Sequence, residues 1–210
     1  MIQPLLFVHI FAGATALGAA GFALGSAKGG ALHRRAGQVY ALGMAITGGT
    51  ALLLATLRPN AFLFAIGVFS LYLVFTGWRA AVLRDGVPRL PDHLAGAAMA
   101  AVGGVMLVWG AHGVIIGMTS QPVILVVFGA IGLTLALGDW RDWRKGAIIG
   151  KARIARHLTR MMAGTIATVT AATTVNLAFL PDLVAWLGPT ALLTPVIFWW
   201  NARILRPSAA

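Results

Sequence analysis

Hydrophobic residues fall into seven long runs that are separated by short polar or basic connections. The runs cover residues 4–25, 38–57, 60–80, 93–117, 121–138, 158–180 and 183–201. A transmembrane helix needs about 17–25 mainly apolar residues, and each run supplies that length. Because the runs fill almost the whole chain, we predict an all-α polytopic membrane protein. Residues 1–210 are expected to form a single domain, a bundle of seven transmembrane helices.

The composition agrees with this prediction and removes several kinds of chemistry. The chain is 59% hydrophobic and only 10% charged, whereas a soluble domain carries about 25% charged residues. It contains no Cys, which excludes a cysteine nucleophile, a thiolate metal site, an iron–sulfur cluster and a disulfide. Its five acidic residues are all Asp and are expected at helix ends or in connections, so paired-carboxylate hydrolysis is not expected.

The net charge of +11 could indicate a nucleic-acid partner, but the positions of the basic residues indicate membrane orientation instead. Fifteen of the 16 Lys and Arg residues lie in alternate connections or in the C-terminal tail, and only Arg58 lies on the other side. The positive-inside rule therefore places the N-terminus outside and the C-terminus in the cytoplasm. We expect a protein of the bacterial inner membrane with lipids, and no nucleic acid, as partners.

The five histidines sort into two layers of the expected bundle. His9 and His112 fall in the outer layer, and His33, His93 and His157 fall at the inner boundary. Two such layers are typical of a transmembrane electron-transfer protein with two b-type haems, because imidazole is a common axial ligand of haem iron. Boundary histidines can equally extend to the interface or cap a helix.

The haem hypothesis assigns a role to each of these residues. His9 and His112 would bind an outer haem, and His157 with His33 or His93 an inner one, with no metal other than haem iron. Arg34 and Arg160 would neutralise the propionates. A quinone or another redox partner would exchange electrons with the haems.

A polar stripe along the run 158–180 offers an alternative. Residues of the stripe include Thr165, Thr168 and Asn176, which fall on one side of a helix. With Tyr40 from the second run, they could line the path of a small-solute or lipid carrier. Thr and Asn also commonly join helices in membranes, so the stripe fits a non-catalytic membrane subunit as well. Whether the protein is an enzyme stays open, as does an internal repeat relating the first three runs to the last three.

Three stretches carry a resemblance to a known family. They are His33-Arg-Arg-Ala-Gly-Gln-Val-Tyr40, Ile66-Gly-Val-Phe-Ser-Leu-Tyr-Leu-Val-Phe-Thr-Gly-Trp78 and Arg156-His157-Leu-Thr-Arg-Met161. With the HRxxGxxY and RHxxRM patterns that they contain, the chain resembles an uncharacterised family of predicted bacterial membrane proteins, a domain of unknown function. The resemblance implies a multi-pass membrane protein and supplies no activity.

Overall fold

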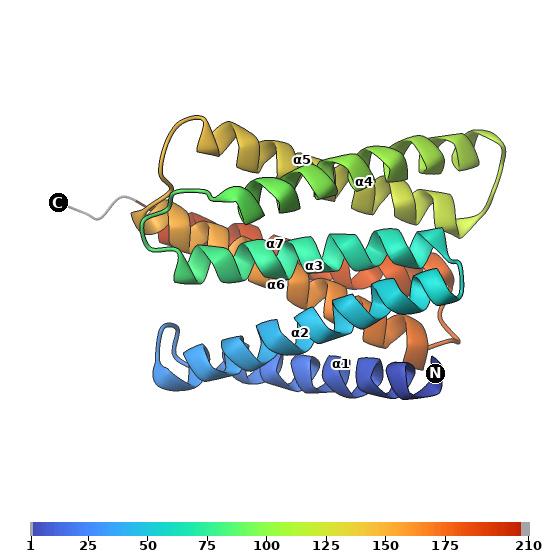
Figure 1. Cartoon of the computed structure of the whole chain (residues 1–210), viewed down its shortest axis with the longest axis horizontal. Coiled ribbons are helices and arrows are strands. Elements are labelled where there is room, and N and C mark those ends of the chain that lie inside the picture. The colour runs from blue at the N-terminus through green and yellow to red at the C-terminus, as the bar shows by residue number, and fades with distance from the viewer. Residues whose placement is uncertain (1, 207–210) are drawn as a thin grey trace.

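The computed structural model describes residues 2–206, which form seven helices joined by short connections (Figure 1). The helices are α1 (Ile2–Gly25), α2 (Ala31–Leu57), α3 (Ala61–Val82), α4 (Leu90–Ile115), α5 (Ser120–Trp143), α6 (Gly150–Asn176) and α7 (Asp182–Leu205). The predicted all-α fold is thereby confirmed.

Helix α3 lies in the middle of the bundle. The hairpin of α1 and α2 packs on one side of α3 and the hairpin of α4 and α5 on the other, while α6 packs against α3 and carries α7 (Figure 1). The largest apolar cluster joins α3, α4 and α5, where Leu73, Met99 and Met106 are completely buried. This arrangement makes α3 and α6 the helices with neighbours on most sides, so several polar side chains on them, such as Thr76, Arg160 and Thr168, are enclosed by protein.

Six of the seven helices are long and apolar enough to cross a membrane, and α6 is not among them. Large apolar side chains cover the outside of the bundle, for example Phe7, Val108 and Leu192, each more than 70% exposed. A soluble protein rarely exposes so much apolar surface, whereas lipid is its natural environment. The protein is therefore a multi-pass membrane protein. Helix α6 differs because Thr residues and four basic residues interrupt its apolar pattern.

The helices extend beyond the hydrophobic runs at several ends. Helix α2 begins at Ala31 instead of residue 38, and α5 continues to Trp143 instead of ending at residue 138. Hydropathy marks only the apolar part of a helix, and backbone hydrogen bonding continues into the basic segments. In contrast, α6 ends at Asn176, before the predicted residue 180. The chain then leads to Pro181, which has no N–H to donate and disfavours a helical conformation of the residue before it.

Local capping accounts for two helix starts. The Asn60 side chain accepts a hydrogen bond of 2.9 Å from the Leu63 N–H at the start of α3. At the start of α4, the carboxylate of Asp92 accepts a hydrogen bond of 2.8 Å from the Arg89 backbone N–H. Helix α7 continues through Pro189 and Pro195 without interruption.

The first and last three helices are not packed alike. Helix α1 lies along α2, whereas α5 lies along α4, and no Cα atom of α5 comes within 8 Å of one in α6 among residues 2–206. The described part of the chain therefore gives no support to an internal repeat.

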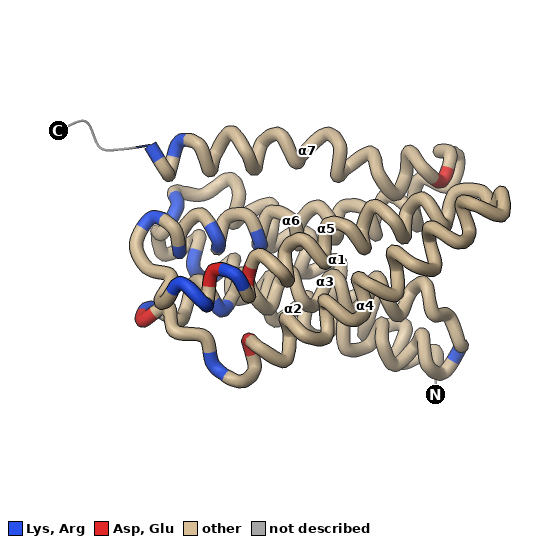
Figure 2. The backbone as a smooth tube through the Cα atoms, turned by 90° about the horizontal axis from the view of Figure 1, so that it is seen from above, with Lys and Arg blue, Asp and Glu red and all other residues tan. Residues whose placement is uncertain are grey.

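Lys and Arg gather at one end of the bundle, and we call this the basic end (Figure 2). It contains the connections α1–α2, α3–α4 and α5–α6 together with the last turn of α7. The opposite end holds Arg58 and Asp182. The fold thus places the predicted inner residues at a common end.

Candidate functional site at the basic end

A buried carboxylate, Asp139, joins three helices near the basic end. Its side chain lies on α5, and it forms ion pairs with Arg156 and Arg160 of α6. The hydroxyl of Tyr72, on α3, donates a hydrogen bond of 2.6 Å to the second carboxylate oxygen. Asp139 is only 1% exposed. Since α5 and α6 are not in backbone contact, these side chains form the link between them.

Arg160 has three hydrogen-bond partners in this network. It donates hydrogen bonds to the Tyr72 hydroxyl, at 2.9 Å, and to the Leu135 carbonyl, at 3.0 Å, in addition to its ion pair with Asp139. Its guanidinium also lies 5.1 Å from the centre of the Tyr72 ring. Its charge is therefore already paired within the protein, and the role of Arg160 as a propionate partner stays a prediction. Arg34 is exposed and donates to the Gly29 carbonyl at 2.8 Å.

The prediction that every carboxylate lies at a helix end or in a connection was incomplete. Asp139 lies one turn before the end of α5, but its side chain is turned inward to Tyr72, which lies in the middle of α3. The position of a residue in the sequence indicates its level along the helix. It does not indicate which neighbouring helix the side chain faces. The spacing of Arg156 and Arg160, one turn apart on α6, was a signal that could have indicated a shared anionic partner.

A second ion pair lies beside the first. Arg79 of α3 donates through Nε and Nη2 to the two carboxylate oxygens of Asp92 on α4, each at 2.7 Å. This is the bidentate geometry that gives arginine its strongest hydrogen bonds. The pair holds the ends of α3 and α4 together at the edge of a small cleft.

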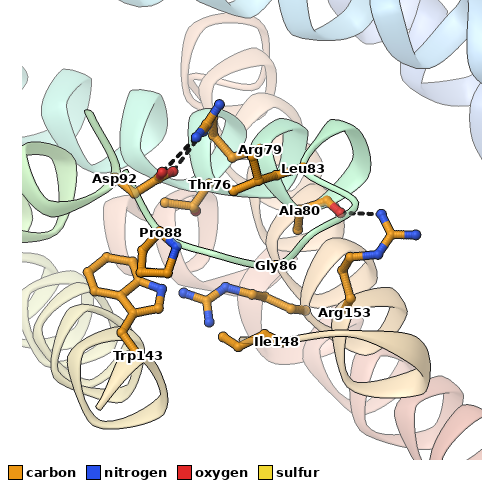
Figure 3. Close-up of a pocket in the computed structure, with 11 residues that line it drawn as sticks. Thr76, Arg79, Ala80, Leu83, Gly86, Pro88, Asp92, Trp143, Ile148 and Arg153 are labelled. Carbon is orange, nitrogen blue, oxygen red and sulfur yellow. Dashed lines mark hydrogen bonds and ion pairs between the residues drawn. The ribbon is translucent and has the colours of Figure 1, made fainter. Parts of the chain in front are cut away.

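The cleft lies between the connections α3–α4 and α5–α6 and encloses about 40 Å³ (Figure 3). Its walls include Thr76 and Pro88 on one side and Trp143 and Ile148 on the other, with Arg79, Arg153 and Arg156 among its lining side chains. The Ile148 N–H donates to the Gly86 carbonyl at 3.1 Å and joins the two connections. Gly86 has a φ of +68°, and a Cβ there would lie 2.3 Å from the Ile148 carbonyl oxygen. Only glycine fits this crossing.

Two of the three inner histidines meet in space. The rings of His33, on α2, and His157, on α6, lie with their centroids 6.4 Å apart and their planes at 86°. His33 donates from Nδ1 to the Ala23 carbonyl at 3.0 Å, and His157 donates from Nδ1 to the Gly77 carbonyl at 2.9 Å. These bonds fix both rings and, in the neutral imidazoles, leave each Nε2 as the unprotonated nitrogen. The third inner histidine, His93, instead packs against Trp143.

The two outer histidines do not meet. His9 lies on α1, where its Nδ1 donates toward the Thr47 carbonyl at 3.0 Å and contacts the Thr50 hydroxyl at 3.1 Å. His112 is exposed on α4, on the other side of α3, and α1 and α4 make no backbone contact among residues 2–206. This arrangement gives no support to a haem held between His9 and His112.

The polar stripe of α6 serves to join helices in this structure. Thr168 donates hydrogen bonds to the Gly164 carbonyl at 2.9 Å and to the Met44 sulfur at 3.3 Å, and its hydroxyl lies 3.3 Å from that of Tyr40. Both Tyr40 and Thr168 are buried between α2 and α6. Thr165 bonds to the Met161 carbonyl, and Asn176 is exposed and bonds to the Ala172 carbonyl. The stripe therefore matches the interhelical alternative better than a solute path.

The three stretches that carry the family resemblance converge in the fold. His33 and Tyr40 of the first contact His157 and Thr168 on α6, and Tyr72 and Gly77 of the second bond to Arg160 and His157 of the third. The chain matches no family model, and no curated protein or solved structure is detectably similar to it. Arguments about function therefore rest on this site.

Proposed function

We propose that this protein spans the bacterial inner membrane seven times, with the N-terminus outside, and binds one b-type haem between His33 and His157 near its cytoplasmic end. The seven-span topology is supported by the gathering of basic residues at one end of the bundle. The observation that carries the haem proposal is the paired imidazoles, each fixed by a backbone carbonyl.

The number of available ligands favours haem over a bare metal ion. A metal ion held by protein alone usually needs three or four side-chain ligands, and residues 2–206 contain no group of three His, Cys, Asp or Glu placed to supply them. Haem brings four nitrogen ligands of its own and asks for only one or two from the protein. Two histidines are therefore a sufficient set for haem.

The distance between the two rings is compatible with binding to one iron. A metal–nitrogen bond of about 2 Å, plus roughly 1 Å from each nitrogen to its ring centre, would allow two imidazoles to share an iron at a centroid separation of about 6 Å. The observed separation is 6.4 Å. Both Nδ1 atoms donate to carbonyls, which is the outer hydrogen bond that orients histidine ligands. No Cα atom of α2 lies within 8 Å of one in α6 over residues 2–206, so these two helices meet only through side chains.

When bound, haem would supply one-electron redox chemistry. The residues of this chain would hold and orient it: His33 and His157 would bind the iron, and exposed Arg34 would neutralise a propionate. The redox partner, a quinone or a protein, would approach the basic end. With the outer pair unsupported, we propose one haem instead of two.

A spectrum of the purified protein tests this proposal. Protein prepared from haem-replete cells is expected to show a Soret band that shifts on reduction with dithionite. His33→Ala and His157→Ala should each weaken haem binding and change the position of the Soret band, because one of the two protein ligands is lost.

His93→Ala and His112→Ala are matched controls, since each removes a histidine from a helix end without touching the pair. Both should keep the spectrum of the wild type. A colourless, folded wild-type protein would overturn the haem proposal and favour a non-catalytic membrane subunit.

A further inference from the structure

The last turns of α5 present an exposed face to the outside of the bundle. We call it the α5 outer face, and its side chains are Leu137, Trp140, Arg141, Arg144 and Lys145. These residues follow one another at the three- and four-residue spacing of a single helix side. All five are exposed, and together they line an open hollow at the basic end. The Arg144 N–H still donates to the Trp140 carbonyl at 3.2 Å, so the helical turn continues into the basic residues.

Three positive charges on this face have no counter-charge in the protein. The side chains of Arg141, Arg144 and Lys145 form no ion pair and no hydrogen bond with any residue from 2 to 206. The two carboxylates at the same end of α5, Asp139 and Asp142, are directed to arginines of α6 instead. The α5 outer face is therefore left to attract an anion from outside the chain.

Other basic residues of this end are engaged within the protein. Arg79 pairs with a carboxylate of α4, Arg153 donates to carbonyls at the end of α3, and Lys28 donates to carbonyls at the end of α1. The positive-inside rule and the helix dipole both account for positive charge near the end of α5. Neither accounts for three unpaired charges on one side of a helix, beside an exposed tryptophan.

The apolar part of the face lies closer to the middle of the bundle than the charges. Trp140 is 63% exposed and Leu137 is 49% exposed, and both precede the basic residues along the helix. Tryptophan favours the level between acyl chains and lipid headgroups. A partner of this face must therefore carry an anionic group at the membrane surface and an apolar group directly beneath it. A phospholipid has this order.

We propose that the α5 outer face binds one anionic phospholipid. The three basic side chains donate to its phosphodiester, for which guanidinium and ammonium groups are well suited. Trp140 and Leu137 contact the upper part of its acyl chains. Only the choice of the cytoplasmic leaflet rests on the proposed orientation. The site is separate from the histidine pair and does not depend on haem.

Native mass spectrometry of the detergent-purified protein tests the site with two lipids of identical acyl chains. The wild type should retain one molecule of phosphatidylglycerol more tightly than phosphatidylcholine. A variant that combines Arg141→Gln, Arg144→Gln and Lys145→Gln should weaken phosphatidylglycerol binding at least about tenfold, since each basic residue at an anionic lipid surface contributes roughly fivefold. Binding of phosphatidylcholine should stay nearly unchanged.

The matched control combines Arg35→Gln, Arg84→Gln and Arg206→Gln. It removes the same charge from three exposed positions elsewhere at the basic end, on three different segments of the chain. This variant should keep the tight binding of phosphatidylglycerol. Equal weakening in the two triple variants, or equal retention of the two lipids by the wild type, would overturn the proposal.

Tryptophan fluorescence locates the bound lipid. Phosphatidylglycerol with brominated acyl chains should quench the emission of the wild type more than brominated phosphatidylcholine does, and Trp140→Phe should remove most of this difference. Trp109→Phe is the control, because Trp109 lies toward the opposite end of α4 from the basic end, and it should keep the difference. A difference that is unchanged in Trp140→Phe would assign the tight lipid to another surface and contradict the proposal.

Discussion

A single carboxylate, that of Asp139, neutralises two guanidiniums and accepts the Tyr72 hydroxyl. Each of these partners is itself poorly accessible to water, with side-chain exposures of 14% for Arg156 and 5% for Arg160. Removing one partner from a buried ion pair leaves the other charge without compensation, and this is far more costly than losing an exposed pair. Asp139 is therefore the residue on which the joint between α3, α5 and α6 depends most.

We predict that Asp139→Asn lowers the free energy of unfolding by about 3–5 kcal/mol, because Arg160 loses its counter-charge and Arg156 keeps only the half-exposed Asp142 at 4.0 Å. Asp85→Asn is the matched control, since Asp85 pairs with Arg89 at a site where both side chains are more than half exposed. Its loss should cost less than about 1 kcal/mol. Denaturant titration of the purified protein, followed by helical circular dichroism, measures both. Similar midpoints for the two variants would contradict this account.

The sequence predicts at which end of the bundle most residues of the site lie. It does not predict which neighbouring helix each of them faces. The hydropathy pattern placed His33, His93 and His157 at one end of the bundle, and the structure has them there. That His33 meets His157 while His93 meets Trp143 depends on the order of helices around α3. This order is set by packing between helices distant in sequence, which single-helix periodicity does not contain.

At the scale of elements, glycines on α4 and α5 allow the backbones of these two helices to pack closely against each other. A Cβ at Gly103 would lie 3.2 Å from the Gly129 carbonyl oxygen, and one at Gly110 would lie 2.7 Å from the Pro122 carbonyl oxygen. Small residues at helix contacts let backbones approach closely, which is a major source of association in lipid. The contact therefore has little room for a methyl group.

Gly110→Ala is expected to destabilise the protein by about 1–3 kcal/mol, because the new Cβ would meet backbone atoms of α5 that cannot rotate away. Gly104→Ala on the same helix meets nothing within 4 Å. This control should be neutral or stabilising by up to about 1 kcal/mol through its better helix propensity. The same unfolding titration compares them, and an equal loss in both variants would refute the role of close packing at Gly110.

Helix α6 shows where hydropathy is a poor guide to an element. The pattern predicted a span over 158–180, yet the observed helix begins at Gly150 and includes a basic first third. Three of its polar side chains, Thr168, His157 and Arg160, find partners on α2, α3 and α5, namely Tyr40, Gly77 and Asp139. The mean hydropathy of one helix does not include the hydrogen-bond and ion-pair partners that other helices provide.

For the whole molecule, the proposed orientation places the connection α4–α5 outside and the connection α5–α6 in the cytoplasm. The chain contains no Cys, so a single introduced cysteine reports its own position without background. We predict that Thr119→Cys, in the first connection, reacts with a membrane-impermeant maleimide in intact spheroplasts. Ala147→Cys, in the second, should react only after the membrane is opened. The reverse pattern would contradict the orientation, and both sites are exposed in the structure.

The placement of four basic residues in the first half of α6 also constrains how the chain enters the membrane. An arginine near the centre of an isolated helix costs about 2.5–3.5 kcal/mol at the translocon, so α6 is a poor candidate to partition into lipid alone. Helices α3 and α5, which supply Tyr72 and Asp139, are synthesised before it. Order of synthesis thus makes the counter-charge available when the guanidiniums emerge, and integration of α6 becomes a cooperative step that waits for its predecessors.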